Sequence, residues 1–214
     1  MNDEGLRERK RRITRARIAE EAMALFAQRG FDRVSVAEIA VAAEVAEKTV
    51  YNYFPSKGEL LFDEAEDLLT ELLHAVSTRP AGRPALAAVR SFIAGLPEWA
   101  AHRRPVRPGE QFRSLIQASP ALQAHRRAMF ARYESELSAL LAEQTGSPPG
   151  AAEPFVAAVA LVGVLRAAFE ATISDRATHQ QNTDRCLDLL AGGLDGYAPA
   201  VGTPSRNPRM RAVP

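Results

Sequence analysis

The chain has 214 residues, of which 46% are hydrophobic and 25% charged, and its formal net charge is +1. This composition is ordinary for a folded globular protein, and the length is sufficient for one or two hydrophobic cores. The longest apolar run, residues 156–164, is well short of the roughly 18 residues that cross a bilayer. The N-terminus is charged and shows no secretory signal, and the single cysteine, Cys186, excludes an internal disulfide. We therefore expect a cytoplasmic protein without a membrane segment.

Positive charge is concentrated at the N-terminus. The first 17 residues contain seven arginines and lysines against three acidic residues. A basic arm of this kind can lie along the phosphates of DNA or enter a minor groove. The alternative is a solvated tail, and both descriptions hold if the arm is disordered alone and ordered on a nucleic acid.

The first predicted helix covers Thr14 to Arg29. Gly30 follows it and suits the left-handed position that ends many helices. Arg15 and Arg17 are expected on its outer side. Its inner stripe is formed by Ile18, Ala22, Leu25 and Phe26.

A helix-turn-helix is predicted from residue 35 to residue 54. Ser35 and Glu38 form a capping box that marks the start of the helix before the turn. A second helix is expected from about Glu47 to Phe54, because Pro55 cannot continue it. Two short helices at a steep angle would present the second one to a DNA major groove. The helix before the turn has an apolar face formed by Val36, Ile39, Ala40 and Ala43.

Three motifs in this region resemble those of the tetracycline-repressor (TetR) family. The family signature Y-x-[HY]-F-x-[ST]-K is similar to YNYFPSK, from Tyr51 to Lys57. Upstream, Ala24-Leu25-Phe26 with Gly30-Phe31 resembles A-x-x-L-F-x-x-x-G-[FY], and Ser35-Val36 with Ile39-Ala40 resembles [ST]-[VI]-x-x-I-A. The motifs occur in the family's order and spacing and cover about residues 13–62.

The resemblance implies a DNA-binding face on these residues. Ser35 and Lys57 would contact phosphates, Lys48 and Thr49 would approach base edges, and Asn52 could pair with adenine. The two tyrosines of the recognition helix would hydrogen-bond phosphates, although either could instead be an ordinary packing residue. The implied set is Ser35, Ala46, Glu47, Lys48, Thr49, Tyr51, Asn52, Tyr53 and Lys57.

Two positions depart from the family pattern. Glu44 stands where the turn usually has glycine, and a left-handed conformation there costs about 1 kcal/mol. Ala46 stands where the recognition helix is often capped by serine, a loss of about 1 kcal/mol. Glu47 offsets part of this loss by facing the helix dipole, but it also places negative charge near DNA.

The remaining chain is predicted to be helical throughout. Ser56 and Glu59 form a second capping box, and the proline and glycine clusters near residues 80, 105 and 148 are expected to separate the helices. Residues 198–214 are expected to be a disordered tail. The expected helices are 57–77, 84–103 with a kink at Gly95 and Pro97, 110–117, 120–145, 151–175 and 178–197.

The helix expected at residues 151–175 is apolar nearly all round, which predicts burial on several sides. In TetR relatives the last two helices form a four-helix dimer interface, so the resemblance implies a homodimer through them. It also implies a small-molecule effector pocket between the middle helices, whose residues could equally be plain core. The candidates are Phe92, Trp99, Phe112, Met129, Phe130, Tyr133, Arg166, Phe169 and Glu170.

Enzyme chemistry is not indicated. The four histidines and Cys186 share no metal-ligand spacing, and no glycine-rich phosphate loop follows a strand pattern. We expect neither a metal nor a cofactor.

The sequence therefore predicts an all-α protein of about nine helices. Residues 1–57 would form the DNA-binding domain, and residues 58–197 the effector-binding and dimerisation domain. Its expected function is that of a ligand-responsive regulator, most simply a repressor, which binds a palindromic DNA operator as a dimer. The alternative is a helical small-molecule-binding or interaction protein whose DNA-binding activity has been lost.

Overall fold

A computed structural model describes residues 3–103, 109–171 and 176–193. These residues contain nine α-helices and one short 3-10 helix, and no strand. The helices are α1 (Asp3–Arg29), α2 (Val36–Ala42), α3 (Glu47–Tyr53), η1 (Gly58–Leu60), α4 (Ala65–Ser77), α5 (Ala85–Arg103), α6 (Gly109–Ala118), α7 (Pro120–Thr145), α8 (Glu153–Ala171) and α9 (Arg176–Gly192).

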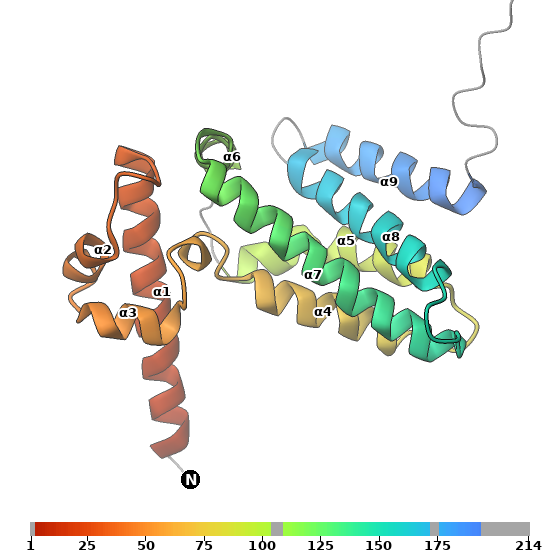
Figure 1. The fold of residues 1–214 in the computed structure, drawn as a ribbon, viewed down its shortest axis with the longest axis horizontal. Helices are drawn as coiled ribbons and strands as arrows, with labels where there is room; N and C mark the ends of the chain where they lie inside the picture. Colours follow the sequence, from red (N-terminus) through yellow and green to blue (C-terminus); the bar gives the residue numbers. More distant parts are fainter. Residues whose placement is uncertain (1–2, 104–108, 172–175, 194–214) are drawn as a thin grey trace, which may run out of the picture.

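Helices α1 to α3 form a head at one end of the molecule (Figure 1). Phe26, Ile39, Val50 and Phe54 are buried together in its core, and Val45 packs against them from the turn. The head core also includes Leu60 of η1, the following Leu61, and residues of the next domain: Leu115, Ile116 and Leu122.

Helix α1 is longer than predicted. The sequence places its start at Thr14 and leaves the basic arm outside, whereas the helix begins at Asp3. The added segment is mostly arginine, glutamate and lysine, which lose little rotamer freedom in a helix. The arm therefore continues the first helix of the head as one rod.

The helix predicted at residues 57–77 is interrupted. The Ser56–Glu59 cap is present, with the backbone N–H of Glu59 donating to the Ser56 hydroxyl at 3.4 Å, but it begins only the single turn η1. Four residues separate η1 from α4, and two of them, Leu61 and Phe62, turn into the head core. Tertiary burial here outweighs the local signal for a continuous helix.

The second domain is a bundle of α4, α5, α7, α8 and α9 (Figure 1). Helix α7 runs along α8 and also contacts α4, while α9 packs on α8 and α5. The bounds of α7 match the prediction, because Ser119 caps its start and Gly146, in the left-handed conformation at φ 62°, ends it. Pro97 lies within α5 as expected. The tail predicted at residues 198–214 lies outside the described residues.

The bundle core and the head core are separate clusters that meet at α7. Leu122, near the start of α7, belongs to the head core, and Leu137 belongs to the bundle core. Met129 lies between them and packs against both. Among the described helices, none is long and apolar enough to cross a membrane.

Candidate nucleic-acid interface

The turn between α2 and α3 has the hydrogen bonds of a Schellman motif. The N–H of Val45 donates to the carbonyl of Ala40 at 2.9 Å, and the N–H of Glu44 donates to that of Val41 at 3.1 Å. Glu44 occupies the left-handed position at φ 52°, where the sequence predicts an unfavourable non-glycine residue. The departure from the family pattern thus falls on a position that does require a positive φ.

Helix α3 presents a polar face to solvent. Glu47, Lys48 and Asn52 are exposed, and Tyr51 is 48% exposed, whereas Val50 is buried beneath them. Thr49 and Tyr53 are half-buried at the edges of this face. Ala46 caps the helix through its backbone carbonyl, which accepts the N–H of Thr49 at 2.8 Å, and makes no side-chain cap.

Arg15 ties α1 to the end of α3. Its guanidinium donates to the carbonyl of Tyr53 and to that of Asp63, both at 3.0 Å, and lies 4.6 Å from the ring centre of Phe54. The prediction that Arg15 lies on the outer side of α1 is wrong. Arg15 lies three residues before the buried Ile18, and this helical spacing places it on the buried stripe. The same spacing could have indicated its position from the sequence.

Ser35 caps α2 through the predicted capping box. Its hydroxyl accepts the N–H of Glu38 at 3.2 Å and donates to the Glu38 carboxylate at 2.8 Å. Bonds from the Ser35 backbone and side chain, together with Arg29 at 2.8 Å, lower the pKa of Glu38 to about 2. In this state the Ser35 hydroxyl is occupied by the cap.

Lys57 faces the head core and not the surface of α3. Its ammonium lies 4.2 Å from the ring centre of Phe31 and 5.9 Å from that of Phe26. Burial lowers the pKa of Lys57, although Asp32 and Glu38 act in the opposite direction. A cation held over an aromatic face stabilises the packing, so a phosphate contact by Lys57 would require the side chain to turn outward.

The head is joined to the bundle by specific contacts. The His125 ring on α7 stacks on Phe62, with centroids 5.1 Å apart and an interplanar angle of 15°. A Cβ at Gly58 would lie only 2.7 Å from His125 Nδ1, so glycine allows this approach. The buried hydroxyl of Ser119 donates to the Asp32 carboxylate at 3.0 Å. Burial lowers the pKa of His125, partly offset by Glu59.

The residues suggested for an effector pocket do not surround one cavity in the described structure. Phe130 and Tyr133 are buried in the bundle core, where the Tyr133 hydroxyl donates to the Ala65 carbonyl. Phe112 and Met129 pack at the head junction, and Phe169 is 42% exposed. The side chains of Trp99 and Glu170 lie outside the described part.

Arg166 makes a polar contact across α7 and α8. Its guanidinium donates to the Glu134 carboxylate at 2.8 Å and lies 4.9 Å from the ring centre of Phe130. Its Nε is buried and has no hydrogen-bond partner among the described residues. An unpartnered buried donor is rare and suits an acceptor atom supplied by a ligand.

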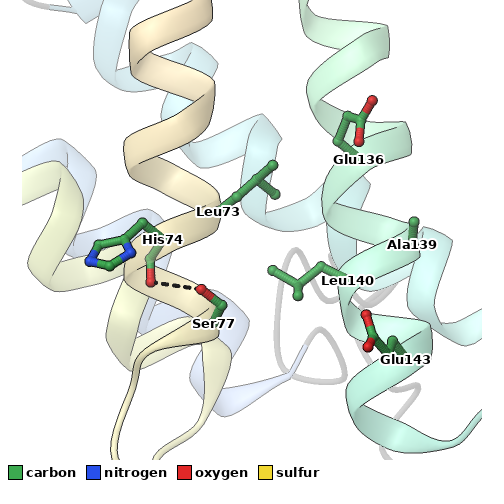
Figure 2. A pocket seen from close by; sticks show the side chains of 7 residues that line it. All are labelled: Leu73, His74, Ser77, Glu136, Ala139, Leu140 and Glu143. Atoms are coloured by element: carbon green, nitrogen blue, oxygen red, sulfur yellow. Dashed lines mark hydrogen bonds between the residues drawn. The ribbon is translucent and has the colours of Figure 1, made fainter.

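Two open grooves flank α4. One, of about 340 Å³, lies between α4 and α7, with Leu73 and Leu140 facing each other and Glu136 and Glu143 along α7 (Figure 2). The other, of about 330 Å³, lies between α4 and α5 and includes Phe92, the only suggested pocket residue with a described side chain that lines either groove. In the described part, no group of three or more potential metal-binding side chains is present.

Comparisons with known proteins agree with this architecture. Residues 18–63 match the family model described as bacterial regulatory proteins of the tetR family, and residues 77–195 match that of the MftR C-terminal domain. MftR of Mycobacterium tuberculosis, named as a transcriptional regulator of mycofactocin biosynthesis, is 28% identical over 195 residues, or 87% of this chain and 94% of MftR.

The N-terminal part has a second relative. The HTH-type transcriptional regulator TcmR of Streptomyces glaucescens is 38% identical over 88 residues, 41% of this chain and 39% of TcmR. The solved structure of a TetR-family regulator from Mesorhizobium loti has the same fold, with a TM-score of 0.54 at 20% identity over 84% of this chain and 95% of that one. The chain belongs to the TetR family, whose members are ligand-responsive DNA-binding transcriptional regulators.

Proposed function

We propose that this protein is a cytoplasmic repressor that binds a palindromic operator as a homodimer and leaves it when a small molecule binds the bundle. In this proposal the two α3 helices enter successive major grooves about 34–36 Å apart. An effector that prefers another spacing of the heads would lower operator affinity by that preference and no more.

The observation that carries the proposal is the outward face of α3. Lys48 and Asn52 are exposed. Lys48 can donate hydrogen bonds to base edges in the major groove, and Asn52 can both donate and accept them. Tyr51 is half-exposed, so its hydroxyl can reach a phosphate while its ring stays against the helix. Thr49 is half-buried and suits a contact between its methyl group and thymine.

Band shifts with a palindromic fragment from the promoter region of the protein's own gene test the DNA contacts. We expect Lys48→Ala, Thr49→Ala and Tyr51→Ala each to weaken binding, while light scattering still reports a dimer. Ala94→Glu, on an exposed position of α5, is the control and should bind as the parent protein does. Unchanged binding by all three α3 variants would reject the assignment of this face.

The proposed dimer interface rests on an apolar surface of α8. Phe155, Val156 and Phe169 are 53%, 62% and 42% exposed in the single chain, and Val159 is 37% exposed. Large apolar side chains exposed along one helix are typical of a surface that a protein partner covers. Val156→Glu should therefore produce a monomer in light scattering at micromolar concentration, and a dimer in that variant would reject this interface.

For the effector we infer contact with Arg166. Its buried Nε can donate to an acceptor oxygen, and the adjacent Phe130 ring offers an apolar surface. A thermal-shift screen can compare the parent protein with Arg166→Met. Compounds with a carboxylate or carbonyl should stabilise only the parent, and equal stabilisation of both proteins would exclude this contact.

The alternative function, a binding protein with an inactive head, draws support from Glu44 and Glu47 beside the proposed DNA face. Glu44 lies 4.0 Å from Arg17, which reduces its effect on a nearby phosphate. Salt-dependent operator binding by the full chain distinguishes the two functions, because an inactive head would show none.

A further inference from the structure

Within the helix, the basic arm comprises residues 5–13 of α1 and is a strongly charged, exposed surface. Every residue of the arm is exposed, including Leu6 at 48% and Ile13 at 56%. At 1.5 Å per residue the arm is about 13 Å long, and it extends past α3 (Figure 1). Five of its nine residues are basic and only Glu8 is acidic: Arg7, Arg9, Lys10, Arg11 and Arg12.

Two arginines of α1 contact the two ends of α3. Arg15 reaches the carbonyl of Tyr53 at the end of α3, and Arg17 approaches Glu44, just before its start, at 4.0 Å. The line of α1 that runs between these two side chains, and includes Ile18, is therefore tied to both ends of α3. Because the arm and the anchored segment belong to one uninterrupted helix, the arm has a fixed direction relative to α3.

Helical spacing determines which arm side chains continue that line. Residues 7, 11, 14 and 18 follow one another at intervals of four, three and four, so Arg7 and Arg11 lie on the face that carries the buried Ile18. Arg9 and Arg12 lie on the opposite face. Glu8 lies between the two faces and does not neutralise one of them alone.

We propose that the arm is a rigid extension of the reading head, which lays Arg7 and Arg11 on the sugar-phosphate backbone beside the groove that α3 enters. The proposal rests on the proposed DNA-binding function. Each head then contacts a longer stretch of duplex than α3 alone reaches. Backbone contacts of this kind fix the register of a reading helix without reading the sequence themselves.

Rigidity separates this arrangement from attraction by a basic tail. A flexible tail gains affinity from any of its charges, because it can turn each of them toward phosphate. A helical arm gains affinity from one face only, and it loses that gain when the helix is broken between the arm and the head. Both consequences can be measured with the full chain.

The first experiment compares the two faces at equal charge. Anisotropy titrations of a labelled operator between 50 and 200 mM salt would use Arg7→Gln/Arg11→Gln and Arg9→Gln/Arg12→Gln. Losing two phosphate contacts per protomer should make the log–log salt slope of the dimer shallower by about 3–4. We expect the first variant to bind about 10- to 100-fold more weakly at 50 mM salt and the second to stay within about threefold. Equal losses, or no loss in either, would overturn the proposal.

The second experiment breaks the helix without removing charge. Ile13→Gly/Thr14→Gly should weaken binding at least tenfold, whereas Ile13→Ala/Thr14→Ala should match the parent protein, because glycine costs about 1 kcal/mol per helical position relative to alanine. Equal binding by the two pairs would contradict a rigid arm, provided that circular dichroism reports a folded bundle in both. The parent protein is titrated alongside. If it fails to bind, the proposed function falls together with the arm; if it binds and the variants do not differ, only the arm proposal falls.

Discussion

Replacing Gly58 by alanine tests the contact between the head and the bundle. The new Cβ would lie 2.7 Å from Nδ1, 3.1 Å from Cγ and 3.2 Å from Cε1 of His125. The ring must retreat by roughly 0.7 Å or more to reach an ordinary contact, but it is stacked on Phe62, itself buried. Overpacking of this kind costs about 1–3 kcal/mol, so Gly58→Ala should lower the free energy of unfolding by that amount.

A double-mutant cycle with His125→Ala makes the prediction specific. Urea unfolding followed by circular dichroism would give the four free energies, and the cost of Gly58→Ala should shrink by about 1–2 kcal/mol once the imidazole is absent. Gly95→Ala is the matched control, because its Cβ meets nothing within 4 Å and alanine favours the helix by about 0.5–1 kcal/mol. An equal cost of Gly58→Ala with and without the imidazole would refute the steric explanation.

Further predictions concern the anchors and caps of the head. Arg15→Ala should lower the free energy of unfolding by about 2–3 kcal/mol, because it removes two charge-assisted hydrogen bonds and a cation–π contact. Arg17→Ala should cost less than about 0.5 kcal/mol, because its ion pair is solvent-exposed; equal losses in urea unfolding would contradict this. Burial holds the pKa of His125 below its ordinary 6.5, so the unfolded chain takes up a proton first as the pH falls below that value. Stability should therefore decrease on acidification, and His125→Gln should reduce that decrease in urea midpoints measured from pH 7.5 to 5. The lowered pKa of Glu38, about 2, stabilises the fold above pH 4.5 and loses this effect as the pH falls toward 2. Ser35→Ala should cost about 1 kcal/mol and raise the pKa of Glu38 in an NMR titration, although the backbone N–H of residue 35 still lowers it; an unchanged pKa would show that the Ser35 hydroxyl is not one of its causes.

Much of the fold could be predicted because its signals are local. Helix α7 begins and ends where predicted, since Ser119 and Gly146 act on their own neighbours. The capping box at Ser35 and the left-handed turn at Glu44 were likewise visible in a few adjacent residues. Periodicity also predicted the apolar face of α2, and its residues Val36, Ile39, Ala40 and Ala43 are buried.

What the sequence could not give depends on distant contacts. The cap at Ser56 predicts a helix to residue 77, but burial of Leu61 and Phe62 in the head core interrupts this helix. Lys57 turns toward Phe31, a partner 26 residues earlier in the chain, which no local pattern indicates. The suggested pocket residues were chosen for their chemistry alone, and aromatic side chains fill cores and line pockets alike.

Helix α7 contributes residues to both the head core and the bundle core. This has a practical consequence for building hybrid regulators. A cut after residue 57 would strip Leu60, Ile116 and Leu122 from the underside of the head and leave an apolar hollow open to water. A DNA-binding module that is to be joined to a different sensor domain would therefore have to include α6 and the first turns of α7. The junction would then lie beyond Met129. Grafts made at the helix-turn-helix boundary would be expected to aggregate, whatever sensor they carry.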